Sequence, residues 1–233
     1  MNQFSKFWLK SIFFLSLPLW LALSLMLVVK TVQAEELTDA IEKQWKFRVF
    51  LDDSEIGYHR VTLNYQQQIK RVNVEADFKV KFLFFTAFRY QHKAEEVWSD
   101  SCLTDIKATT NNNGDSLFIR KNNKSANFKL LSHAGEQQLE GCVRSFAYWD
   151  VELLKADHLL NTQSGEIEEV KLHKLGDSVL QFEDKNIPAI KYRLSLKDKS
   201  IDLWYSANMN WLALQSETEG GYQLSYYSEA IAF

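Results

Sequence analysis

The stretch FKVKFLFFTAFRY (Phe78–Tyr90) is the most apolar run of the chain beyond its N-terminal segment. From Arg71 to Phe82, which includes the start of this run, every second side chain is apolar and the intervening ones are charged or polar. The apolar positions are Val72, Val74, Ala76, Phe78, Val80 and Phe82. A period of two is the signature of a β-strand with one buried face. We therefore interpret Arg71–Phe85 as a long central strand around which the other strands pair.

Similar alternation flanks this strand on both sides. Trp45–Leu51 and Tyr58–Tyr65 precede it, and Phe88–Trp98 and Cys102–Thr110 follow it. The sequence Asn-Asn-Asn-Gly at 111–114 is a strong hairpin signal, because Asn-Gly fits a type I′ turn. Further turn signals recur every 8–12 residues, which is typical of an all-β sandwich or barrel. The sequence predicts an all-β fold: an antiparallel sheet that is strongly curved or closed into a barrel.

Residues 141–161 (GCVRSFAYWDVELLKADHLLN) break this rhythm. Phe146, Trp149, Leu153 and Leu154 recur there at a spacing typical of a helix. We predict one short helix, at Tyr148–Leu154, packed against one end of the sheet.

The N-terminus has the layout of an export signal. A basic segment with Lys6 and Lys10 precedes an apolar run, Ile12–Val29, and small residues lead to Ala34. The run is about 18 residues long, near the lower limit for a membrane-spanning helix. Two outcomes stay open: cleavage after Ala34, or retention as an anchor that contacts the membrane. The predicted division is a signal or anchor helix at 1–34 and one β-rich domain at 35–233, located in the periplasm or anchored in the inner membrane facing it.

Charge and cysteine content bear on partners and compartment. The segment 1–34 holds three of the 27 basic residues and none of the 30 acidic ones, which leaves the remainder with a net charge of −6. This balance disfavours nucleic acid as a partner. The two cysteines, Cys102 and Cys142, both follow the signal. An even number in an oxidising compartment predicts one disulfide between them.

Catalytic and metal motifs do not occur in the sequence: there is no H-E-x-x-H, G-x-S-x-G, phosphate loop or dinucleotide fingerprint. We therefore predict no catalytic residue, metal or cofactor. His59 and His92 fall on predicted strands that pairing can bring together, but histidines on strands are usually structural. Asp150, Asp157 and His158 cluster near the predicted helix, where a solvated surface is the simpler interpretation and a hydrolase-type enzyme the third-ranked one.

The positive signal is aromatic content, since Phe, Tyr and Trp make up 14% of the chain. Aromatic side chains at alternate positions of curved strands line either a packed core or an apolar cavity. The candidate cavity lining is Phe78, Val80, Phe82, Phe84 and Trp98. This pattern predicts non-catalytic handling of a lipid or other apolar ligand, or an envelope assembly factor with protein partners.

The alternative is an outer-membrane β-barrel, whose strands alternate in the same way with the apolar face on lipid. The chain ends in Phe233, preceded at steps of two by Ile231, while Glu229 interrupts that face.

Four stretches carry a resemblance to a known family: WKFRVFLDDSEIG (45–57), CLTDIKATTNNNG (102–114), GCVRSFAYWD (141–150) and NTQSGE (161–166). The chain resembles an uncharacterised family of proteobacterial exported proteins, a domain of unknown function, from Trp45 to about Tyr227. The resemblance implies a curved antiparallel sheet or half-barrel, loosely similar to lipoprotein-carrier folds. It supplies no active-site residues, and it supports ligand binding only by analogy of fold.

Overall fold

The computed structural model describes residues 42–66, 68–82, 85–122 and 127–231. They belong to one compact unit, Ala40–Phe233. The predicted signal or anchor at 1–34 lies outside the described residues. Within the described ranges, no helix combines the length and apolar character needed to cross a membrane.

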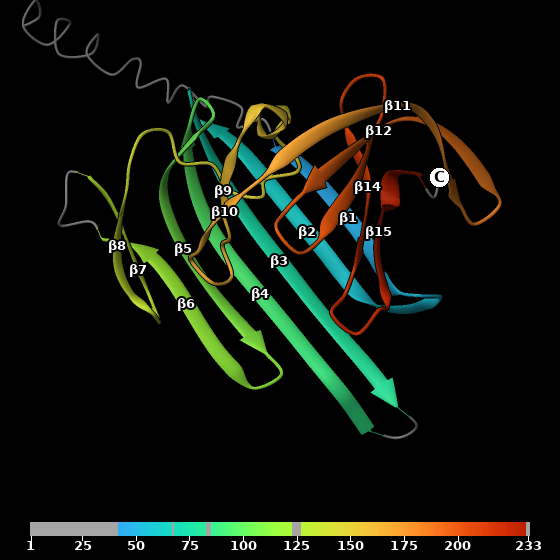
Figure 1. Ribbon diagram of the computed structural model, residues 1–233, viewed down its shortest axis with the longest axis horizontal. Helices are drawn as coiled ribbons and strands as arrows, with labels where there is room; N and C mark the ends of the chain where they lie inside the picture. Colours follow the sequence, from blue (N-terminus) through green and yellow to red (C-terminus); the bar gives the residue numbers. More distant parts are fainter. Residues whose placement is uncertain (1–41, 67, 83–84, 123–126, 232–233) are drawn as a thin grey trace, which may run out of the picture. The chain divides into compact units, whose positions relative to one another are not determined.

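Thirteen of the described strands form one antiparallel sheet (Figure 1). Their order is β11-β12-β13-β14-β15-β1-β2-β3-β4-β5-β6-β7-β8, so the sheet is not closed and its edges are β8 and β11. The first half comprises β1 (Glu42–Leu51), β2 (Ser54–Gln66), β3 (Ile69–Phe82), β4 (Phe85–Ser99), β5 (Cys102–Asn112), β6 (Asp115–Lys121), β7 (Phe128–Ser132) and β8 (Gly135–Leu139). The second half comprises β11 (Lys171–Phe182), β12 (Lys185–Ser195), β13 (Ser200–Tyr205), β14 (Trp211–Glu217) and β15 (Gln223–Ser228).

The sheet consists of two meanders joined at β1. Strand β1 pairs with β2 on one side and with β15 on the other, and Phe47 lies opposite both His59 and Ser228. The all-β, antiparallel prediction is therefore confirmed, whereas closure into a barrel is not observed. The predicted strand Arg71–Phe85 begins and ends too late: β3 begins at Ile69 and ends at Phe82, which pairs with Phe85 at the start of β4. Apolar residues on both faces of this run, without Gly, Pro, Asn or Asp, concealed the strand boundary.

The main core lies on one face of the sheet. Its fully buried members include Phe47 on β1, Leu63 on β2, Trp98 on β4 and Leu203 on β13. A second core, with Trp204, Leu212 and Phe182, forms from side chains of alternate phase on the second meander. Neighbouring residues such as Leu203 and Trp204 thus point to opposite faces, and both faces are covered there.

Residues 140–170, which we call the crossover segment, connect edge β8 to edge β11 and lie across the main core (Figure 1). The segment contains the 3₁₀-helix η1 (Val151–Lys155) and a hairpin of β9 (His158–Leu160) and β10 (Ile167–Glu169). It contributes Val143, Leu153 and Leu160 to the main core. Its Trp149 ring lies 5.6 Å from that of Trp98 between centroids.

The predicted helix Tyr148–Leu154 is only partly correct. The chain turns at Tyr148–Asp150, and the helix is a five-residue 3₁₀-helix that begins after Asp150. Asp150 caps it by accepting a hydrogen bond from the Glu152 backbone N–H at 3.1 Å. Helical spacing was misleading because the buried side chains of this segment come from an irregular backbone.

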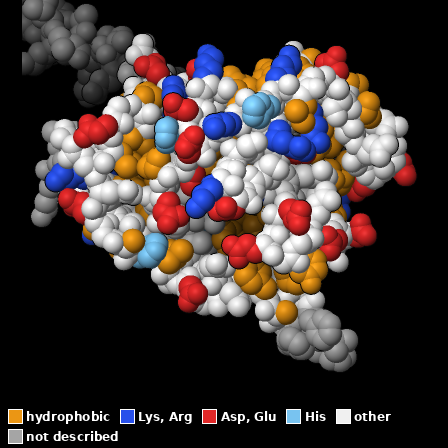
Figure 2. Space-filling model, in the orientation of Figure 1, with side chains coloured by type: hydrophobic (Ala, Val, Ile, Leu, Met, Phe, Trp, Pro, Cys, Tyr) orange, Lys and Arg blue, Asp and Glu red, His pale blue; other side chains and the backbone are white. Residues whose placement is uncertain are grey.

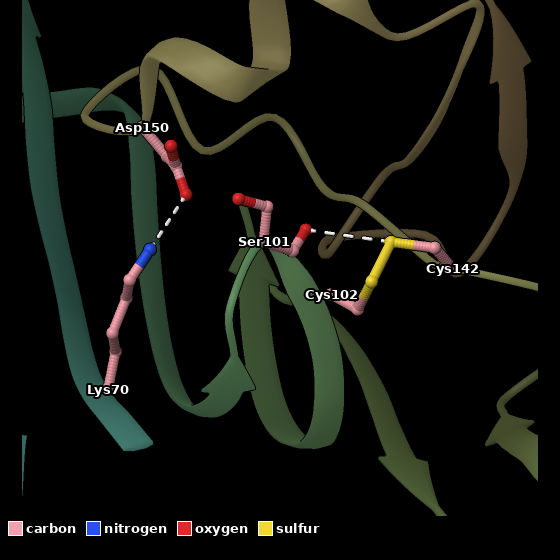
Figure 3. Close-up of a disulfide and its surroundings, with 5 residues drawn as sticks. All are labelled: Lys70, Ser101, Cys102, Cys142 and Asp150. Carbon is pink, nitrogen blue, oxygen red and sulfur yellow. Dashed lines mark hydrogen bonds and ion pairs between the residues drawn. A yellow bond between two sulfur atoms is a disulfide. The ribbon is translucent and has the colours of Figure 1, made fainter. Parts of the chain in front are cut away.

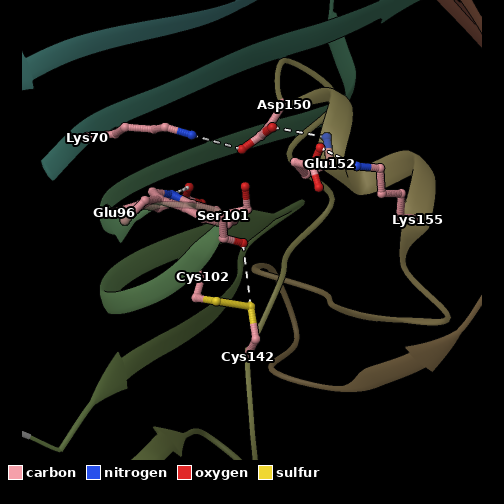
Figure 4. A network of polar contacts seen from close by, with 9 residues as sticks. Lys70, Glu96, Ser101, Cys102, Cys142, Asp150, Glu152 and Lys155 are labelled. Atoms are coloured by element: carbon pink, nitrogen blue, oxygen red, sulfur yellow. Dashed lines mark hydrogen bonds and ion pairs between the residues drawn. A yellow bond between two sulfur atoms is a disulfide. The ribbon is translucent and has the colours of Figure 1, made fainter. Parts of the chain in front are cut away.

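A disulfide, a backbone hydrogen bond and an ion pair attach the crossover segment to the first meander. The predicted disulfide between Cys102, at the start of β5, and Cys142 is present (Figure 3). The Leu103 backbone N–H donates to the Val143 carbonyl at 2.8 Å. Lys70 on β3 pairs with Asp150 at 3.2 Å, and their side chains are 17% and 10% exposed. Figure 4 shows that this ion pair and the helix cap share the Asp150 carboxylate.

Candidate functional site

A cavity of about 230 Å³ lies between the main-core face of the sheet and the crossover segment. The sheet side consists of residues from β2, β3, β4, β13, β14 and β15. The opposite side consists of residues 145–149, 161–163 and Glu168 of the crossover segment, with Lys199 from the turn between β12 and β13. The cavity exists because the segment bridges the curved sheet without filling its middle.

Strand register explains which side chains meet in the cavity. His59 on β2 lies opposite Ala76 on β3, and Ala76 lies opposite His92 on β4. Two histidines therefore flank a small residue in one row across the sheet. Val74 and Ala94 form the neighbouring pair on the same face. The small side chain at Ala76 leaves room that the cavity occupies.

The two histidines are uncharged at neutral pH. Burial, followed by the proximity of His92, lowers the pKa of His59 to about 3. Burial lowers the pKa of His92 to about 4. The His92 Nδ1 lies 2.9 Å from Thr110 Oγ1, and its Nε2 lies 3.5 Å from Thr162 Oγ1. The buried Nδ1 of His59 has no hydrogen-bond partner in the part of the chain that the structure describes.

Glu96 is the buried acid of the site. Its side chain is on the inward face of β4, the residue is 5% exposed, and its carboxylate accepts a hydrogen bond from Trp98 Nε1 at 2.8 Å. Burial raises its pKa to about 7, and the Trp98 hydrogen bond opposes that shift. Among the described residues, no lysine or arginine forms an ion pair with it. With this pKa, the Glu96 carboxyl is close to the midpoint between its two protonation states at neutral pH.

Three tyrosines complete the polar lining: Tyr90 on β4, Tyr148 in the crossover segment and Tyr226 on β15. Burial raises the pKa of each phenol, so all three remain protonated at physiological pH. The Tyr148 ring lies 5.2 Å from that of Trp211, between centroids. The hydroxyls make no hydrogen bond to another described residue, which leaves them as donors and acceptors for a bound molecule.

The cavity offers hydrogen-bonding groups and aromatic surface. Ser145 and Thr162 supply hydroxyls to the lining. His92 lies at a long 3.5 Å from the Thr162 hydroxyl. No group of three or more His, Cys, Asp or Glu suited to a metal ion occurs in the described ranges.

Of the residues predicted to line a cavity, the structure describes the side chains of Phe78, Val80 and Trp98, and these three do not belong to the lining given above. Phe78 and Trp98 are buried, the first stacked on Tyr90 at 5.1 Å and the second in the main core. Val80 borders a different hollow of about 530 Å³, at the turn between β1 and β2. The side chain of Phe82, and Phe84 entirely, lie outside the described residues.

The acidic cluster near η1 does not enter the cavity. Asp150 is paired with Lys70, while Asp157 and His158 form an exposed contact of 3.1 Å. The two strand histidines do share the cavity, one on each side of Ala76. Sequence reasoning missed Glu96, although one signal was available: it occupies the apolar phase of β4 between Ala94 and Trp98.

Among solved structures, the chain is similar to a β-barrel-like protein of domain of unknown function DUF1849 from Brucella abortus. The TM-score is 0.56 at 7% sequence identity, over 81% of this chain and 95% of that one. At this identity the likeness concerns the fold alone. No curated protein matches the sequence.

A family model described as a domain of unknown function, DUF6134, matches residues 47–228. This range runs from the middle of β1 to the end of β15, and so includes every strand that lines the cavity. Because the match covers well over half of the chain, the protein belongs to the DUF6134 family.

Proposed function

We propose that this protein is a non-catalytic binding module of the cell envelope, which holds a small amphipathic molecule in the cavity under the crossover segment. The observation that carries the proposal is the cavity itself. It brings aromatic rings together with three phenol hydroxyls and with the His59 Nδ1, which has no hydrogen-bond partner in the described part of the chain. Pockets that bind organic ligands combine apolar walls with a few placed polar groups in this way.

The size of the cavity limits the ligand. Its 230 Å³ lies below the roughly 300–1,000 Å³ typical of drug-sized ligands. A small molecule, or one end of a larger apolar molecule such as a lipid, matches this volume. The location in the envelope rests on the signal-like N-terminus and is supported by the disulfide, since disulfides persist in oxidising compartments.

The sheet topology favours this proposal over an outer-membrane barrel. An open sheet edge leaves backbone N–H and C=O groups unpaired, which the hydrocarbon core of a membrane does not tolerate. Strands β8 and β11 each pair on one side only in the described sheet.

Native mass spectrometry of protein purified from the periplasmic fraction tests the proposal. We expect a co-purifying small molecule at one copy per chain, which solvent extraction releases. Ala76→Leu places a larger side chain between His59 and His92 and should abolish the adduct. Ala87→Leu, at an exposed position of β4, is the matched control and should retain it.

Two results would contradict the proposal. One is an adduct that persists unchanged in Ala76→Leu while thermal unfolding shows that the variant is folded. The other is a wild-type protein that carries no molecule and whose tryptophan fluorescence does not respond to any member of a panel of small amphiphiles.

A further inference from the structure

Resting on the proposed function, we propose that the cavity recognises a small organic cation, an alkylammonium group held among aromatic rings beside Glu96. The inference names the ligand class for the same cavity. It depends on three features of the lining: the aromatic faces, the uncompensated buried acid and the distribution of charge around it.

Aromatic side chains approach the cavity from four elements. Tyr90 comes from β4, Tyr148 and Trp149 from the crossover segment, Trp211 from β14 and Tyr226 from β15. A cation within about 6 Å of such a ring is attracted by the negative face of its π-system, most strongly where water is excluded. The same chemistry already occurs beside the site, where Lys70 Nζ lies 5.6 Å from the Trp149 ring centroid.

Glu96 is the acidic group that would pair with a positively charged ligand. Its described hydrogen-bond partner is the Trp98 indole N–H, which is a neutral donor, and its ionisation inside the protein is uncompensated by any described cation. A buried charge is costly unless it is paired. An ammonium ligand in the cavity would pair with the carboxylate, so that the acid and the aromatic rings act on the same positive group.

Other charges around the cavity agree with a cationic ligand. His59 on β2 and His92 on β4 are neutral, and Glu168 on β10 adds a second acid that accepts a hydrogen bond from Asn161 at 2.8 Å. The cationic member of the lining, Lys199, is exposed in the turn between β12 and β13. The interior lining is therefore acidic and aromatic, which disfavours an anion.

The pH dependence follows from the same arrangement. An ammonium binds better to ionised than to protonated Glu96, whose pKa in the unliganded protein is about 7. Affinity should therefore rise as the pH rises through that value, and binding should release a proton. Both histidines stay neutral throughout this range, since burial holds their pKa values at about 3 and about 4.

The test compares choline with its neutral carbon isostere, in which a tert-butyl group replaces the trimethylammonium group. Isothermal titration of the purified, ligand-depleted protein at pH 6 and pH 8 measures both. At pH 8 we expect choline to bind at least about tenfold more tightly than the neutral isostere, a difference in binding free energy of about 1.4 kcal/mol. The preference should shrink at pH 6 and in Glu96→Gln, where only the attraction of the aromatic rings remains. Glu95→Gln, on the exposed face of the same strand, should behave as wild type.

The outcomes separate this inference from the proposed function. If the neutral isostere binds to wild type as tightly as choline, or if Glu96→Gln keeps the full preference, the cation inference is overturned while small-molecule binding stands. If neither probe binds at millimolar concentration, and Ala76→Leu changes nothing, both are overturned.

Discussion

Glu96 makes the stability of the protein depend on pH. Burial raises its pKa from 4.5 to about 7, so the unfolded chain ionises at a lower pH than the folded protein. The stabilisation is complete below pH 4.5 and is lost as the pH rises through about 7. At about 1.4 kcal/mol per unit, the loss over this window is on the order of 3 kcal/mol.

Urea unfolding of wild type and Glu96→Gln at pH 5 and pH 8 measures this loss. The comparison is needed because His59 and His92 act in the opposite direction: their lowered pKa values remove stability as the pH falls below 6.5. Both proteins keep the histidines, so the difference between them isolates Glu96. We expect wild type to lose more stability than the variant from pH 5 to pH 8. Parallel profiles would show that Glu96 is not buried as an acid.

Gly57 allows close approach of β2 and β3. Its φ is +151°, and a Cβ at this position would lie 1.9 Å from the Asp77 backbone oxygen. We expect Gly57→Ala to cost several kcal/mol in unfolding free energy, because two backbone segments would have to separate. Gly114→Ala is the control: it also has positive φ, at +105°, but its Cβ would meet nothing within 4 Å. It should cost about 1–3 kcal/mol. Equal losses in chemical denaturation would contradict the steric explanation.

The sequence predicted the disulfide cysteines better than it predicted the residues that line the cavity. The Cys102–Cys142 disulfide was predictable, because a chain with two cysteines allows a single intramolecular pair. The cavity lining was not, because an alternating pattern identifies the buried face without showing where that face is left unfilled. Val72 and Ala76 occupy the same phase of β3, yet Val72 is packed in the core and Ala76 borders the cavity. The difference is set by the crossover segment above them, about 70 residues later in the chain.

The disulfide is the covalent attachment of the crossover segment to β5. In the chain-entropy model, a cross-link that closes a loop of 40 residues stabilises the folded state by about 4 kcal/mol. Replacing both Cys102 and Cys142 with alanine should lower the unfolding free energy by that order. Reduction of wild type should lower it by a similar amount, whereas reductant should not affect the double variant. An unchanged denaturation midpoint in the double variant would mean that packing of the segment alone holds it in place.

Strands were easier to predict than the segment that covers them. The pattern around Phe78 predicted paired strands because alternation depends only on local burial of one face. Segment 140–170 buries Val143, Trp149, Leu153 and Leu160 from turns, a 3₁₀-helix and a short hairpin. No fixed period describes such a mixture, so the predicted helix Tyr148–Leu154 agreed with the structure only in part.

Connectivity of the whole sheet could not be predicted from local patterns. Alternation and turn signals predict consecutive hairpins, and these account for β1 to β8 and β11 to β15. The contact that unites the two meanders is β1 with β15, in which Phe47 lies opposite Ser228. Nothing in either strand specifies its partner, because both present an ordinary half-buried pattern. This pairing places Trp211 and Tyr226 of the second meander beside His59 of the first, and thereby completes the cavity.

A sheet joined in this way should unfold as one unit. Phe47 is fully buried, its ring lies 4.0 Å from that of Trp211 between centroids, and it packs in the core that the crossover segment shares with both meanders. We expect one denaturant transition, with coincident midpoints for tryptophan fluorescence and far-ultraviolet circular dichroism. Phe47→Ala should cost about 3–5 kcal/mol and move both midpoints together. If only the fluorescence midpoint moved, or if two transitions separated, the meanders would be independent folding units, and the cavity would be a contact between them rather than part of one core.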